Sequence, residues 1–147
     1  MRFHRIAAIA LLGPAAVVWG SAPTGAEQPT VTLTAGMSGA REVPGPGDRD
    51  GSGVARITVD TATGEICHSL TVRNIAPASA AHIHRAARDA AGSVVLHLAA
   101  PTDGSSSGCA VNAALASALV ADPAAYYVNV HNAEFPGGAV RGQLAGR

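Results

Sequence analysis

The chain has 147 residues, of which 14% are charged and 3% are aromatic, and its formal net charge is zero. This length is typical of one domain with a hydrophobic core. The balanced charge excludes the basic surface with which proteins bind nucleic acid or anionic membranes.

The first 26 residues have the organisation of a secretory signal peptide. Arg2 and Arg5 form a basic start, residues 6–19 are largely apolar, and residues 24–26 are the small-residue cleavage site. The apolar run is too short to span a bilayer. We therefore expect cleavage after residue 26, a single domain over residues 27–147, and a secreted or periplasmic protein without a membrane anchor.

The sequence contains two cysteines, Cys67 and Cys109. Two cysteines in an exported chain favour a disulfide over a metal pair or a catalytic thiol. Two free thiols are the alternative.

Turn signals at short intervals separate runs that alternate between apolar and polar residues, which predicts an all-β domain. Loops are predicted over residues 39–53 and 101–108, and a helix over 112–121 with Asn112 as its N-cap. The pattern predicts an antiparallel β-sandwich or small barrel of about seven strands with one short helix. The strands are predicted over residues 31–37, 54–60, 65–75, 80–84, 93–100, 126–132 and 139–145.

Alternation along a strand assigns side chains to faces. Ile83 should point into the core, which sends His82 and His84 outward together. In the last hairpin Val128, Val130, Val140 and Leu144 form the predicted core face, so the outward side chains are Tyr127, Asn129, His131, Arg141 and Gln143.

The two other histidines of the domain differ in their predicted positions. Val94, Leu96 and Leu98 are core candidates, which places His97 outside. His68 shares the parity of a core face, so we expect a core or rim histidine with one hydrogen bond.

Two outward imidazoles at positions i and i+2 can bind one ion at about 2 Å from each nitrogen. A third imidazole from a neighbouring strand completes a set typical of zinc or copper. We therefore name His82, His84 and His131 as candidate metal ligands and His97 as a possible extra ligand. Polar residues on an exposed strand are the alternative interpretation, because periodicity does not show which strands are neighbours.

Other residues of the last hairpin have structural interpretations beside functional ones. Arg141 is expected to pair with Glu134 or Asp89, or to support His131. Asn129 is expected to orient an imidazole or to be solvated. Gly137 and Gly138 fit a turn with positive φ, and Gly142 fits a close approach of another segment.

Three stretches together resemble the CHRD domain, a family named from chordin: "LTAGMSGAREVPG", "AAHIHRAARDAAGSVVLHLAAPTDGSSSGC" and "YYVNVHNAEFPGGAVRGQL". The resemblance runs from about Val31 to Leu144 and implies an exported domain with an immunoglobulin-like or superoxide-dismutase-like β-sandwich. His82, His84, His131 and Arg141 belong to the family motifs. His68 and His97 depart from the usual pattern.

Two functions remain open. The first is an exported module with a surface copper or zinc site. The second is a protein- or glycan-binding or structural envelope module without a metal; its extracellular or envelope partner is unknown. No serine or cysteine nucleophile stands beside a recognisable base, so the sequence favours a non-enzyme.

Overall fold

A computed structural model describes residues 30–146, so the predicted signal peptide lies outside the described residues. Within this range the elements follow in the order β1 (Val31–Ser38), η1 (Gly39–Arg41), β2 (Ser52–Asp60), β3 (Glu65–Arg73), β4 (Ala78–Arg85), β5 (Ser93–Leu98), β6 (Ser105–Val111), α1 (Ala113–Ala121), η2 (Pro123–Ala125), β7 (Tyr126–Asn132), β8 (Val140–Gln143) and β9 (Ala145–Gly146). The all-β class with one short α-helix is thus confirmed.

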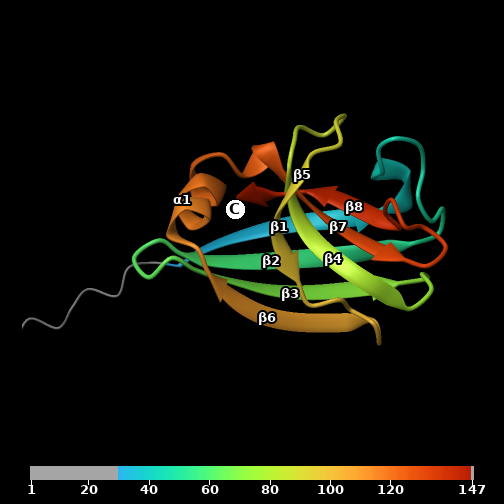
Figure 1. The fold of residues 1–147 in the computed structure, drawn as a ribbon, viewed down its shortest axis with the longest axis horizontal. Helices are drawn as coiled ribbons and strands as arrows, with labels where there is room; N and C mark the ends of the chain where they lie inside the picture. The colour runs from blue at the N-terminus through green and yellow to red at the C-terminus, as the bar shows by residue number, and fades with distance from the viewer. Residues whose placement is uncertain (1–29, 147) are drawn as a thin grey trace, which may run out of the picture.

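The strands form one antiparallel sheet in the order β5-β4-β7-β8-β1-β2-β3-β6, and the short β9 pairs with β1. The sheet curls into a nearly closed barrel of eight strands (Figure 1). The small barrel is therefore the better of the two predicted architectures.

The barrel has a seam where the edge strands β5 and β6 face each other without a ladder. Side chains bridge the seam at Ala99, just after β5. The N–H of Ala99 donates to His68 Nε2 at 3.2 Å, and Ser106 Oγ donates to the Ala99 carbonyl at 2.7 Å. His68 is buried, as predicted, and has the one hydrogen bond expected of it.

The predicted loop over residues 101–108 is wrong in its second half, because β6 begins at Ser105. Its serines and glycine do not alternate with apolar residues, so no strand signal is present. The strand forms because the ladder of β3 provides hydrogen-bond partners for its backbone. The predicted disulfide is confirmed: Cys67 and Cys109 are bonded and lie directly opposite each other in this ladder.

The barrel interior contains the predicted core face of the last hairpin. Val128, Val130, Val140 and Leu144 are each at most 1% exposed, and Ile83 on β4 is fully buried. The prediction for β5 is only partly correct, because Leu98 is buried while Val94 is 41% exposed. As an edge strand, β5 has a neighbour on one side alone, and this leaves Val94 uncovered.

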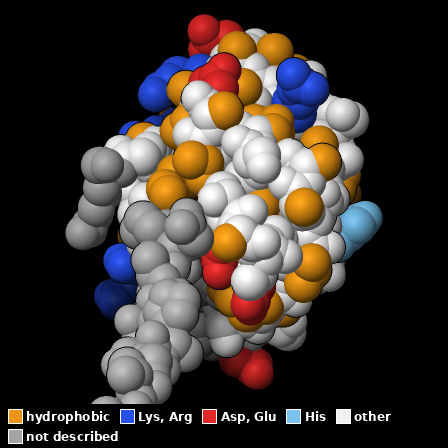
Figure 2. Space-filling model, turned by 90° about the vertical axis from the view of Figure 1, so that its left-hand side faces the viewer, with side chains coloured by type: hydrophobic (Ala, Val, Ile, Leu, Met, Phe, Trp, Pro, Cys, Tyr) orange, Lys and Arg blue, Asp and Glu red, His pale blue; other side chains and the backbone are white. Residues whose placement is uncertain are grey.

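The helix α1 packs Leu115 and Leu119 against the core at one end of the barrel (Figure 1). The side chain of Asn112 caps it as predicted, by accepting a hydrogen bond from the N–H of Leu115. Acidic, basic and apolar side chains are interspersed on this end of the molecule (Figure 2). Among residues 30–146, no helix has the length and hydropathy of a membrane span.

Candidate metal centre

The predicted histidines come together because β4 and β7 are antiparallel neighbours. His82 lies opposite Asn129, and His131 lies opposite Ala80, two residues along the same ladder. Alternation places Ile83 and Val130 inside the barrel, so all three imidazoles leave the sheet on its outer face. The structure thus brings His82, His84 and His131 together.

The ring nitrogens of the three histidines converge. One ligand nitrogen from each of His82, His84 and His131 lies within 4.8 Å of the other two. The closest pair is His82 Nδ1 and His131 Nε2, at 3.0 Å.

Backbone carbonyls orient two of the three rings. His84 Nδ1 lies 2.9 Å from the Gly92 carbonyl, and His131 Nδ1 lies 3.0 Å from the Pro136 carbonyl. A carbonyl oxygen only accepts, so each Nδ1 carries the hydrogen and each Nε2 of the neutral ring carries a lone pair. His84 Nε2 is buried without a hydrogen-bond partner among the described residues.

Burial keeps these rings neutral. Burial, together with the nearby His131, His84 and His97, lowers the pKa of His82 to about 4. Burial also lowers the pKa of His84 and of His131, although their hydrogen bonds to carbonyls oppose this effect. Neutral imidazole is the form that binds a metal ion.

The outer face is less open than alternation alone suggested, because residues 86–92 fold over it as a cover loop. Arg141 Nη2 donates to the carbonyls of Ala87 and Ala90, both at 2.9 Å. The N–H of Gly92 donates to the hydroxyl of Tyr127 at 3.1 Å. Tyr127 and Arg141 thus lie on the outer face of the sheet, as predicted. The cover loop nevertheless buries both side chains, which are 3% and 2% exposed.

Arg141 does not make the expected ion pair with Glu134 or Asp89, because its hydrogen bonds go to the carbonyls of the cover loop. Its guanidinium carbon also lies 3.4 Å from the centre of the Tyr127 ring. The ring of His84 stacks on Tyr127 with centroids 4.8 Å apart. Arg141 and Tyr127 therefore hold the loop that orients His84.

Asn129 is buried and is not solvated as one interpretation expected. Its Nδ2 donates to both carboxylate oxygens of Glu42, at 3.0 and 2.9 Å. Burial raises the pKa of Glu42 to about 7, while Arg141 and the Asn129 hydrogen bond lower it. Glu42 was not predicted from the sequence, because it lies in an irregular loop in which no periodicity marks a buried side chain.

His97 lies beside this group but outside it. It is opposite His82 in the ladder of β4 and β5, and the two rings meet edge to face with centroids 4.8 Å apart. His97 is exposed, as predicted, and does not belong to the set of converging nitrogens. A second group, Glu65 with Cys67 and Cys109, has its two sulfurs in the disulfide.

The lowered histidine pKa values predict a pH dependence of stability. As the pH falls below 6.5, the unfolded chain takes up protons on these histidines while the folded protein resists until near pH 4 for His82. The unfolded state then binds more protons, so the free energy of unfolding of the metal-free protein falls between about pH 6.5 and pH 4. The raised pKa of Glu42 has the opposite effect and increases stability as the pH falls, but it concerns one group, whereas three histidines have lowered pKa values.

Urea titrations at several pH values measure this dependence. The His82→Asn variant, which lacks the most strongly shifted group, should show a shallower decline. A stability that rises steadily from pH 6.5 to pH 4.5 would contradict the burial of the three rings.

Fold and site together define a class: a small disulfide-bonded β-barrel module with three neutral imidazoles converging on its outer face. The family follows from the sequence comparison. The chain belongs to the CHRD domain family, whose domain matches residues 33–144. No curated protein and no solved structure matched the chain. CHRD domains are of extracellular type, and the disulfide fits an oxidising compartment.

Proposed function

We propose that this protein is an exported module that binds one copper or zinc ion through His82, His84 and His131. The orientation of the rings is the observation that carries the proposal. Two of the imidazoles donate Nδ1–H to backbone carbonyls, which leaves the lone pair on Nε2, and one ring nitrogen of each of the three histidines lies within 4.8 Å of the others. This is the arrangement in which protein histidines usually bind metals, because the second hydrogen bond sets the tautomer and the direction of the ligand nitrogen.

The donor set selects the class of metal. Imidazole nitrogens suit zinc and copper, whereas calcium and magnesium require oxygen ligands. Two nitrogens bound to one ion at about 2.0 Å lie about 2.8 Å apart at a right angle and about 3.3 Å apart at a tetrahedral angle. The separation of 3.0 Å between His82 Nδ1 and His131 Nε2 is close to both values.

Each protein group has a defined part in such a site. His84 and His131 offer Nε2, while His82 offers Nδ1 once its hydrogen, which it donates to His131 Nε2, moves to Nε2 of the His82 ring. Three protein ligands leave a further coordination position for water or an external group. Exposed His97 lies beside His82 but is not one of the three converging ligands.

The proposed location is outside the cytoplasm. The first 26 residues have the pattern of a signal peptide, and the Cys67–Cys109 disulfide persists in an oxidising environment. An exported module with a metal site meets copper and zinc without a cytoplasmic thiol pool that competes for them.

Calorimetric titration of the metal-free protein with Zn(II) and with Cu(II) tests the proposal. We expect one ion per chain with a dissociation constant in the micromolar range or below. His131→Ala removes one of three ligands and should weaken binding at least tenfold. His97→Ala removes an exposed imidazole outside the converging set and should change the affinity less than threefold.

Thermal denaturation separates a lost ligand from a lost fold. The metal should raise the melting temperature of the wild-type protein and of His97→Ala, because binding to the native state stabilises it. His131→Ala should melt cooperatively but without this increase. Undiminished affinity in His131→Ala, or no saturable binding by the wild-type protein, would leave the histidines as a hydrogen-bonded group in a module without a metal.

A further inference from the structure

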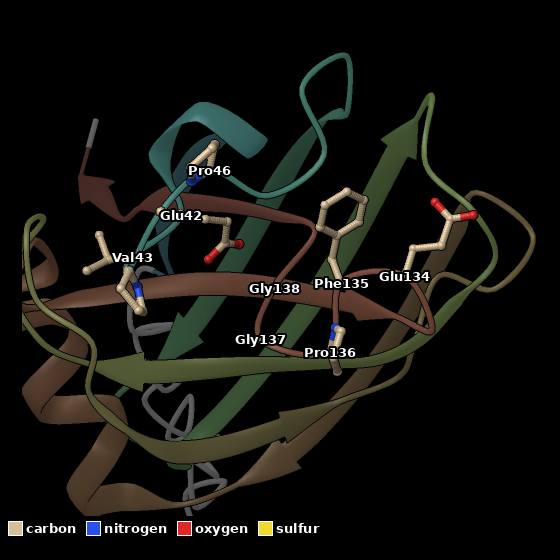
Figure 3. Close-up of a pocket in the computed structure, with 10 residues that line it drawn as sticks. Glu42, Val43, Pro46, Glu134, Phe135, Pro136, Gly137 and Gly138 are labelled. Atoms are coloured by element: carbon tan, nitrogen blue, oxygen red, sulfur yellow. The ribbon is translucent and has the colours of Figure 1, made fainter.

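A pocket of about 210 Å³ lies between the loop that follows η1 and the turn that joins β7 to β8. Figure 3 shows the two segments facing each other, with the Glu42 carboxylate and the Phe135 ring directed into the space between them. The lining residues are Glu42, Val43, Pro44, Gly45, Pro46, Glu134, Phe135, Pro136, Gly137 and Gly138.

The Glu42 carboxylate is the charged group at the base of this pocket. Glu42 is 8% exposed, and the side chain that donates to it is the neutral amide of Asn129. Arg141 is a nearby cation, but its hydrogen bonds go to the cover loop instead. Glu134 reaches the rim of the pocket and points away from Glu42 (Figure 3).

A carboxylate held in this way is short of positive charge. It has about four lone-pair sites, of which the Asn129 amide fills at most two and the backbone N–H of Val43 one more. Burial without a paired cation disfavours the charged form, and the pKa of Glu42 is raised to about 7 for this reason. A ligand with a positive charge and several N–H donors would supply both the missing charge and the missing hydrogen bonds.

The Glu42 carboxylate packs directly against the backbone of Gly138. Gly138 has a φ of 143°, and a Cβ there would lie 2.5 Å from both oxygens of Glu42. Any residue with a side chain at this position would clash with the carboxylate, so the turn requires glycine here. Phe135, Pro44 and Pro46 provide the apolar part of the remaining walls.

We propose that this pocket binds a primary alkylammonium group, with its –NH₃⁺ on the Glu42 carboxylate and its methylene chain along Phe135 and the prolines. The size of the pocket supports a ligand of this kind. A volume of 210 Å³ is below the roughly 300–1,000 Å³ typical of drug-sized ligands, so it suits a short chain such as a lysine side chain or a small free amine. An aromatic ring beside the cation adds a cation–π contribution.

A metal ion fits this pocket less well. Calcium binds six to eight oxygen ligands and magnesium six. The pocket directs a single carboxylate inward, because Glu134 points away. An alkylammonium needs only one carboxylate and an apolar surface for its chain.

Titration of the full-length, metal-free protein by NMR at pH 8 tests the inference, since Glu42 is ionised one pH unit above its pKa. The probes are n-butylammonium, its neutral counterpart n-butanol, and N-acetyl-lysine N-methylamide, which distinguishes a free amine from a lysine side chain. We expect saturable shifts of the Phe135 and Gly138 amides with n-butylammonium or the lysine derivative. Butanol should cause none.

Two charge variants locate the binding group. Glu42→Gln keeps the shape of the side chain and should weaken amine binding at least tenfold. Glu134→Gln removes the same charge from the rim and should change it less than twofold. Phe135→Leu leaves the carboxylate in place and should weaken binding a few-fold, so the inference stays testable if Glu42→Gln unfolds.

Equal shifts with butanol would overturn the inference, because binding would then depend on apolar contact and not on the ammonium group. Equal effects of Glu42→Gln and Glu134→Gln would also overturn it, because binding would then depend on the overall charge of the surface and not on the Glu42 carboxylate. The titration contains no metal ion. Its outcome is therefore independent of the proposed copper or zinc site.

Discussion

Replacing Arg141 with methionine should lower the free energy of unfolding by about 3 kcal/mol. The side chain is 2% exposed, and its Nη2 donates to two carbonyls of the cover loop. Hydrogen bonds from a charged donor contribute about 1.5–3 kcal/mol each, and the loop regains part of this by hydration when it loosens. Methionine fills much of the volume beside Tyr127 but donates no hydrogen bond.

Urea denaturation measures this loss, and Arg85→Met is the matched control. Arg85 is exposed on β4, so its replacement should change stability by less than about 0.5 kcal/mol. Hydrogen exchange should show faster exchange at Gly92, whose N–H donates to Tyr127 in the same loop. Arg141→Met as stable as Arg85→Met would mean that the cover loop is held by other contacts.

Replacing Gly142 with alanine should cost about 3 kcal/mol of stability. A Cβ at this position would lie 2.5 Å from the Gly36 carbonyl oxygen and 2.9 Å from its carbon. These are backbone atoms of β1, which has a full ladder with β2 on its other side. The strand must shift as a unit to make room, and overpacking of this kind typically costs 1–3 kcal/mol.

The control lies five residues earlier in the same motif. Gly137 has no neighbouring atom within 4 Å of an added Cβ, so Gly137→Ala should change stability by less than about 0.5 kcal/mol. Thermal or chemical unfolding of the two variants decides the matter. Equal stability would show that β1 and β8 move apart easily at Gly142.

The histidine cluster could be predicted because it follows from a local rule. Strand alternation places His82, His84 and His131 on the face opposite Ile83 and Val130, and the structure agrees. The pairing of β4 with β7, which brings the two segments together, is a long-range contact that periodicity does not contain.

Alternation identifies a face but not what covers it. The cover loop buries Arg141 and Tyr127, and its hydrogen bonds depend on the path of an irregular segment without a repeating pattern. Glu42 escaped prediction for the same reason. Its loop folds back over the sheet, and its buried contact is with Asn129, 87 residues away.

The strand β6 shows a different limit of prediction from sequence. Intrinsic preference is a weak guide for a serine-rich segment, and neighbouring backbone decides whether it pairs. The disulfide was predictable from composition and compartment alone, although it fixes a strand that the pattern did not reveal.

The seam between β5 and β6, beside His68, is the place where the barrel wall lacks a backbone ladder. Two side-chain hydrogen bonds at Ala99 bridge this seam, where other neighbouring strands share main-chain ladders. The bond to His68 exists only while Nε2 has a free lone pair, so protonation of that ring removes it. Acidification should therefore leave the Ser106–Ala99 hydrogen bond as the remaining one of these two bonds, while the Cys67–Cys109 disulfide keeps β6 joined to β3.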